Sequence, residues 1–98
     1  MSVEVVGLFP VRAGELLTPV LLGTGGPCSV RLAPSDPFRT ALLYRADQLV
    51  VVHNHIDASP PSEADRRATR RMRSLGVLLG LTLVGQVVVG GGVAHVVD

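Results

Sequence analysis

The residues best suited to chemistry are two histidines that stand one residue apart. His53 and His55 follow a continuously apolar run at residues 49–52, which predicts a buried strand ending at the histidines. Side chains at positions i and i+2 of a strand point to the same side, so both imidazoles can reach one metal ion. Asp65 follows ten residues after His55, beyond a stiff loop with two prolines that can return the chain over the strand end. Two histidines and an aspartate predict a Zn²⁺ site with one position open to water.

A zinc-activated water needs a proton acceptor, and Glu4 is the acid that we expect in this role. Glu4 lies in the apolar segment 3–11, where burial of a carboxylate lowers stability. Glu4 would take a proton from the water and then give it to the leaving group. The Ser62 hydroxyl would bind the developing oxyanion. Ser62 and Asp65 also form a capping box, which explains both residues through helix initiation alone, so this second interpretation stays open.

The order of these residues along the chain resembles a known family. Three segments of this chain resemble the JAMM motif of the MPN/JAB zinc metallopeptidases. They are Glu4-x-x-Gly7-Leu8, His53-x-His55 and Ser62-x-x-Asp65. The resemblance covers nearly the whole chain and is to the bacterial RadC-like branch in particular. It implies that the two histidines and the aspartate bind zinc, that the glutamate is the general base, and that the serine stabilises the tetrahedral intermediate. It also implies a three-layer, cytidine-deaminase-like α/β fold.

The chain departs from this family pattern at several positions. Ile56 stands where the family usually has proline, the loop to Ser62 is one residue short, and Gly85-Gln86 replaces the usual Asp-His of RadC proteins. The helices that usually precede the glutamate strand and close the family domain are not evident. We therefore expect a minimal domain whose uncovered core face is buried by self-association, in a homodimer.

The rest of the pattern predicts one α/β domain over residues 1–98 with a mixed sheet and two main helices. The first helix should begin at Ser35 or Asp36 and run to about Ala46, with Phe38 and Tyr44 in the core by their helical spacing. The second helix should begin at Ser62 and end at Gly80. Hydropathy predicts an inward stripe on the second helix, which is Ala64, Ala68, Met72, Leu75 and Leu79. The predicted strands cover residues 3–11, 16–22, 28–32, 49–52, 81–89 and 93–97, with a loop at 56–61.

Composition indicates the class of protein and its cellular compartment, but it does not indicate a binding partner. The net charge is only +1, and 47% of the residues are hydrophobic, which is typical of a globular chain. Cys28 is the sole cysteine, so no intramolecular disulfide can form. With no signal-peptide pattern at the start, we expect a cytoplasmic protein. Residues 74–97 carry no Asp, Glu, Lys or Arg, but six glycines interrupt them, so we expect strands and no membrane span.

Two functions of different classes fit this sequence. The first is a zinc metallopeptidase that hydrolyses an amide or isopeptide bond of a peptide, a ubiquitin-like protein or a sulfur-carrier protein. The second is a non-catalytic RadC/MPN-like module, related to DNA repair, that binds a protein or nucleic acid through the arginines of residues 66–73. We favour a solvated helix face as the explanation of these arginines, because the overall charge is low and no aromatic residues interleave with them. We favour the peptidase and do not expect nucleic acid as the main partner.

Overall fold

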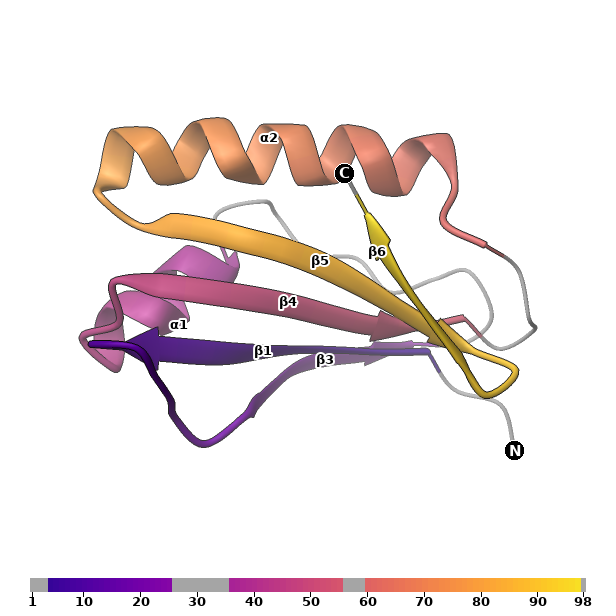
Figure 1. The fold of residues 1–98 in the computed structure, drawn as a ribbon, viewed down its shortest axis with the longest axis horizontal. Coiled ribbons are helices and arrows are strands. Elements are labelled where there is room, and N and C mark those ends of the chain that lie inside the picture. The colour runs from indigo at the N-terminus through magenta and orange to yellow at the C-terminus, as the bar shows by residue number, and fades with distance from the viewer. Residues whose placement is uncertain (1–3, 26–35, 56–59, 98) are drawn as a thin grey trace.

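The computed structural model describes residues 4–25, 36–55 and 60–97 and builds them into one mixed sheet with two helices (Figure 1). The strands are β1 (Glu4–Arg12), β2 (Glu15–Leu16), β3 (Val20–Gly25), β4 (Gln48–Asn54), β5 (Thr82–Gly90) and β6 (Val93–Val97). The helices are α1 (Asp36–Leu43) and α2 (Glu63–Leu79). This arrangement confirms the predicted α/β class with a mixed sheet and two main helices.

The strand that carries the histidines lies in the centre of the sheet. The order is β2-β1-β4-β5-β6, and β3 also pairs with β1. β4 runs antiparallel to β1 and parallel to β5, so α2 supplies the crossover that a parallel pair requires. The predicted strand at 16–22 is divided into β2 and β3, because Pro19 cannot donate a ladder hydrogen bond. The predicted strand at 28–32 lies outside the described residues.

Both ends of α2 follow from local chemistry that the sequence shows. Ser62 is the N-cap, and its side chain accepts a hydrogen bond from the Asp65 N–H. Gly80 ends the helix in the left-handed conformation with φ 71°, which glycine adopts without steric strain. The predicted bounds of this helix are confirmed. α1 ends earlier than predicted, at Leu43, and Arg45 takes φ 55° in the turn that follows.

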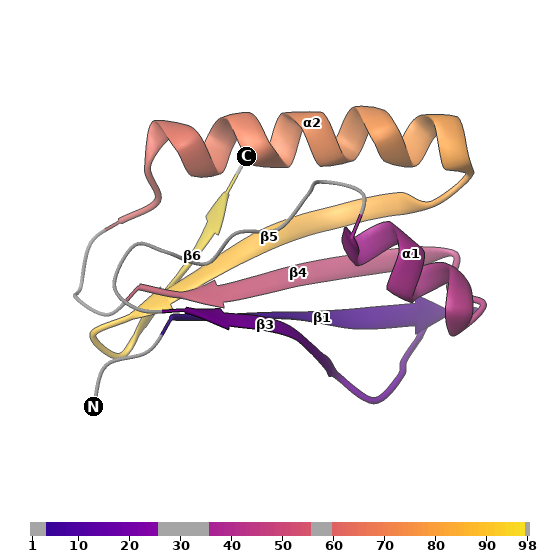
Figure 2. The same cartoon turned by 180° about the vertical axis from the view of Figure 1, so that it is seen from behind.

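One face of the sheet carries the main core. Both helices contribute to a single buried cluster, so both pack on this face (Figure 2). The cluster comprises Leu8, Phe38, Ala41, Ala46, Leu49, Val51, Met72, Leu81 and Leu83. Gly76 permits the closest approach, because a Cβ there would overlap the carbonyl oxygen of Leu81 and press on the Phe38 ring. The buried line of α2 is Thr69, Met72 and Gly76. The predicted stripe is confirmed at Met72 and at Leu75, which packs partly buried against the cluster, and it is wrong at the exposed Ala64 and Leu79.

The opposite face of the sheet is less protected in the described part of the chain. Val84 of β5 and Val96 of β6 are 54% and 70% exposed. No described helix covers them, which agrees with the minimal form of the fold. The predicted homodimer would cover such a surface and stays a prediction. Neither helix described here has the length and apolar character needed to cross a bilayer.

Candidate metal centre

The end of β4 places both histidines on the face of the sheet that α2 covers. His53 lies opposite Val6 of β1 and Val88 of β5. The His55 N–H donates to the Val89 carbonyl at 2.7 Å, which continues the ladder one residue beyond the end of β4. Because strand side chains alternate, His53 and His55 project to the same side. The two rings lie with their Nε2 atoms 3.2 Å apart.

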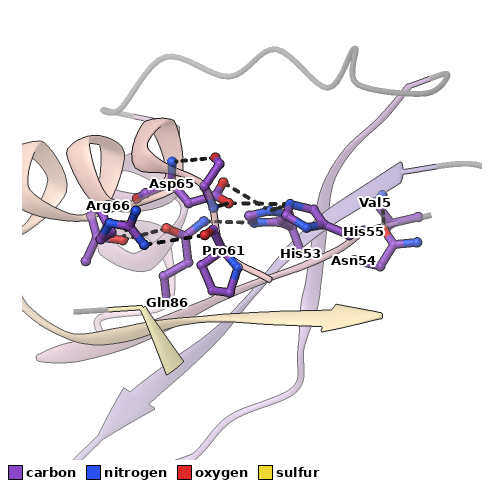
Figure 3. Close-up of polar contacts among 10 residues, drawn as sticks. Val5, His53, Asn54, His55, Pro61, Asp65, Arg66 and Gln86 are labelled. Atoms are coloured by element: carbon purple, nitrogen blue, oxygen red, sulfur yellow. Dashed lines mark hydrogen bonds and ion pairs between the residues drawn. The ribbon is translucent and has the colours of Figure 1, made fainter. Parts of the chain in front are cut away.

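The first turn of α2 brings the aspartate to the same place. Asp65 Oδ1 lies 3.4 Å from His53 Nε2, and Asp65 Oδ2 lies 3.4 Å from His55 Nε2. The three side chains are only 12–15% exposed. Figure 3 shows them converging between the strand end and the helix. The structure therefore brings together three residues predicted from spacing alone, and they form a group able to hold a metal ion.

The donor set and its spacing fit tetrahedral zinc. Zinc binds imidazole nitrogen at about 2.0–2.1 Å, so neighbouring donors of a tetrahedral site stand about 3.3–3.4 Å apart. The observed separations are 3.2 Å between the two Nε2 atoms, 3.4 Å from His53 Nε2 to Asp65 Oδ1 and 3.4 Å from His55 Nε2 to Asp65 Oδ2. The aspartate therefore faces each histidine with a different oxygen. Two neutral imidazoles and one carboxylate leave a fourth position for water or substrate, which is the donor set of catalytic zinc sites.

The capping box and the His-His-Asp group share the Asp65 carboxylate, because Oδ2 lies in the cap and also faces His55. Asp65 Oδ2 accepts the Ser62 N–H at 2.7 Å, and the Asp65 N–H donates to Ser62 Oγ at 3.1 Å. The cap therefore holds one carboxylate oxygen and leaves Oδ1 directed at His53. Ser62 Oγ accepts in this cap, so its hydroxyl hydrogen can still be donated to a substrate oxygen. The two interpretations of the serine and the aspartate are compatible.

Glu4 is described only through its backbone. It pairs with Gly25 at the start of β1, two residues before Val6, which lies opposite His53. The Asn54 side-chain oxygen accepts the Val5 N–H, which ties this end of β1 to the end of β4. The backbone thus carries position 4 to the edge of the metal group. The departure at Ile56 lies outside the described residues.

Gln86 is a site residue that sequence reasoning did not find. Its amide lies 2.8 Å from His53 Nδ1 and 2.6 Å from the Thr69 hydroxyl oxygen. In the family pattern, Gln86 is only a departure from the usual Asp-His pair. The available signal was one amide within a strand that otherwise consists of Val, Leu, Gly and Thr. A buried amide in such a strand needs polar partners, and here they are a histidine and a helical threonine.

The arginine-rich face of α2 is partly neutralised by an acid of the same helix. Glu63 accepts hydrogen bonds from Arg66 at 3.0 Å and from Arg70 at 3.2 Å. These two bonds lower the pKa of the exposed Glu63 carboxyl. Arg66 also donates to the Pro61 carbonyl at 3.4 Å, which braces the segment before the cap. This geometry favours a solvated helix face over a phosphate-binding stripe.

Comparison with known proteins places this geometry in a family. The model of the RadC-like JAB domain family matches residues 4–96, which include all five predicted site residues. The chain belongs to the RadC-like JAB domain family. A UPF0758 protein of Symbiobacterium thermophilum is 37% identical over 94 residues, which cover 94% of this chain and 40% of that protein.

Two further relatives show the same relation. A UPF0758 protein of Syntrophomonas wolfei is 33% identical over 84 residues, covering 85% of this chain and 36% of the relative. One of Thermotoga maritima is 46% identical over 57 residues, covering 57% of this chain and 26% of the relative. This chain therefore spans between about a quarter and two fifths of the length of these relatives.

Proposed function

We propose that this RadC-like JAB domain is a zinc-dependent peptidase that hydrolyses an amide or isopeptide bond. The observation that carries the proposal is the convergence of His53, His55 and Asp65 at the donor spacing of tetrahedral zinc. Zinc bound there would polarise a carbonyl and lower the pKa of a water toward about 7.

The residues of the chain would supply the remaining functions. Glu4 would accept the proton of the attacking water and pass it to the leaving amine, because a carboxylate beside an acidified water is a suitable base. Ser62 would donate its hydroxyl hydrogen to the oxygen that gains charge in the transition state. The cap supports this role, since it fixes the Ser62 oxygen through the Asp65 N–H while using only a lone pair.

The substrate class that we propose is a peptide or a small protein of the ubiquitin-like or sulfur-carrier type. An isopeptide or a flexible C-terminal tail is an extended chain, and such a chain can reach a site at the rim of a sheet. The described residues hold the metal group where β4 ends and α2 begins, so the group lies at such a rim (Figure 3).

The test compares Glu4→Gln with the unchanged protein at matched zinc content. We expect the variant to keep its zinc and lose about 10²–10⁴-fold in hydrolysis of a panel of peptide and isopeptide substrates. Glu15→Gln, an exposed acid of β2, is the control and should keep full activity. A zinc-loaded protein that cleaves none of the panel, or a Glu4→Gln variant as active as the parent, would contradict the proposal.

The alternative of a non-catalytic, partner-binding module has weaker support. Two of the arginines that would form its binding stripe are engaged by Glu63. Such a module would bind DNA or an acidic protein with an affinity that falls steeply with salt and that does not change in Glu4→Gln. Salt-dependent binding without any hydrolysis would favour this alternative.

A further inference from the structure

Gln86 and Thr69 are the buried polar side chains of the described residues, and they contact each other. Thr69 is fully buried in α2, and Gln86 is 5% exposed in β5. Burial of an amide and a hydroxyl lowers stability unless each finds hydrogen-bond partners. Here the partners form a chain that runs from the α2 backbone through both side chains to His53. This chain ends on an imidazole of the metal group.

The direction of the hydrogen bonds in this network decides which ring nitrogen of His53 carries the hydrogen. Thr69 Oγ1 lies 3.0 Å from the Asp65 carbonyl oxygen and 2.6 Å from the Gln86 amide oxygen. A hydroxyl has one hydrogen, so it can donate to only one of these two acceptors. With the amide oxygen toward Thr69, the amide nitrogen faces His53 Nδ1 at 2.8 Å and would donate to it.

A half-turn of the amide satisfies every contact. The turn exchanges the oxygen and nitrogen of Gln86 with almost no change in shape. Thr69 then donates to the Asp65 carbonyl, Gln86 donates to Thr69, and His53 Nδ1–H donates to Gln86. Three hydrogen bonds form in place of two. The Thr69–Gln86 separation needs to lengthen only by about 0.3 Å to reach the usual N–H···O distance.

This direction prepares His53 for a metal. A hydrogen on Nδ1 leaves the lone pair of a neutral imidazole on Nε2, and Nε2 is the atom that faces Asp65 and His55. Histidines that bind metals commonly donate their other N–H to a protein acceptor, which fixes the ring and increases ligand basicity.

We infer that Gln86, held by Thr69, is a positioning residue that keeps the proton of His53 on Nδ1 and directs Nε2 at the metal. The inference rests on the proposed metal centre, which it deepens. The same chain of bonds ties Gln86 to the backbone of Asp65, so one buried network connects two of the three expected ligands.

The test measures zinc affinity by competition with a chelator for the unchanged protein, Gln86→Met and Gln86→Glu. Met fills a similar volume without an acceptor, so we expect affinity to fall by about 10–100-fold. Glu can accept from both His53 Nδ1–H and the Thr69 hydroxyl, so it should restore the affinity. Thr69→Val should reduce the affinity less than Gln86→Met, because it frees the amide without removing the acceptor.

A spectroscopic measurement separates positioning from simple packing. In the zinc-loaded protein, we expect the His53 Nδ1–H to give a slowly exchanging proton resonance with an NOE to Gln86. This resonance should exchange rapidly with water in Gln86→Met and be protected again in Gln86→Glu.

The outcomes distinguish the inference from the proposed function. Tight zinc binding by both the unchanged protein and Gln86→Met would overturn the role of Gln86 and leave the metal centre in place. Failure of Gln86→Glu to restore the affinity or the protected proton would also overturn it, in favour of a packing role. An unchanged protein that binds no zinc would overturn the metal centre and this inference together.

Discussion

The two halves of α2 meet the same sheet through different chemistry. In the first half, Asp65 and Thr69 face His53 and Gln86 through polar contacts of 2.6–3.4 Å. In the second half, Gly76 packs against the backbone that leads into β5 with no polar side chain between them. The two ends of the helix therefore differ in role: its beginning brings together the residues of the candidate metal group, and its end packs closely against the rest of the fold. Variants at the two ends should therefore separate metal binding from stability.

The largest expected effect is a loss of zinc affinity in Asp65→Asn, at the polar end of α2. Asparagine can still accept the Ser62 N–H and so preserve the cap, but it lacks the negative charge that makes a carboxylate a zinc ligand. We expect zinc affinity to fall by more than the roughly 100-fold typical of outer partners. The free energy of unfolding of the metal-free protein should change by less than about 1 kcal/mol. Chelator competition and denaturant unfolding measure the two quantities. A large loss of both zinc affinity and stability in Asp65→Asn would contradict the proposed difference between the two ends of α2.

At the apolar end of α2, Gly76→Ala should lower stability and leave zinc binding unchanged. The new methyl group would overlap the Leu81 carbonyl oxygen, so the helix must move away from the sheet. We expect the free energy of unfolding to fall by about 3 kcal/mol, measured by urea denaturation, with zinc stoichiometry unchanged in the folded fraction.

Gly85→Ala is the matched control for this variant. Its methyl group would meet only Val96 Cγ1, at 4.0 Å, so unfolding should change by less than about 1 kcal/mol. A Gly76→Ala protein as stable as Gly85→Ala would show that the end of α2 is not the close-packed region.

A smaller effect is expected at Ser62, which has both the capping role and the oxyanion role. Variants of this residue should separate the loss of stability from the loss of activity. Ser62→Ala removes both the cap oxygen and the hydroxyl, so it should lower stability by about 1 kcal/mol and activity by about 100-fold. Ser62→Gly also lacks the hydroxyl, but glycine is a good N-cap and should lower stability by only a few tenths of a kcal/mol. Equal activity loss in the two variants, with unequal thermal stability, is the expected result. Full activity in Ser62→Gly would limit the serine to capping.

The smallest effect is expected on the outer surface of α2, at Glu63. Its pKa in the folded protein is below the ordinary value of 4.5 because Arg66 and Arg70 donate hydrogen bonds to it. A lowered pKa adds stability above pH 4.5, and this contribution is lost as the pH falls through the folded-state value. The stability difference between metal-free native protein and Glu63→Gln should therefore shrink on acidification and in high salt. A difference that grew on acidification would reverse the assigned sign.

Short-range signals in the sequence predicted the parts of the fold that depend on local chemistry. Ser62 and Gly80 cap the two ends of α2, as the capping rules predict. The apolar run before His53 forms the central strand. The spacing of the histidines and Asp65 sufficed to predict their convergence, because few residues separate the end of β4 at Asn54 from the start of α2 at Glu63.

Longer-range features could not be read in the same way. Hydropathy placed Ala64 and Leu79 inward, yet Thr69 and Gly76 face the sheet. The reason is tertiary: Thr69 is buried against Gln86, seventeen positions away, and Gly76 is selected by the close approach of the backbone near Leu81. Tyr44 was expected in the core by its helical spacing, but α1 ends before it and leaves it 42% exposed. Partners distant in sequence decide such positions.

The central claim is that the polar end of α2 and the end of β4 form a metal site. Elemental mass spectrometry after zinc loading and exhaustive dialysis tests it directly, with the native protein beside the double variant His53→Ala/His55→Ala. The account predicts about one zinc per chain in the native protein, none in the double variant, and an unchanged value in folded Gly76→Ala. A native protein that retains no zinc, or a double variant that retains as much as the native protein, would contradict it.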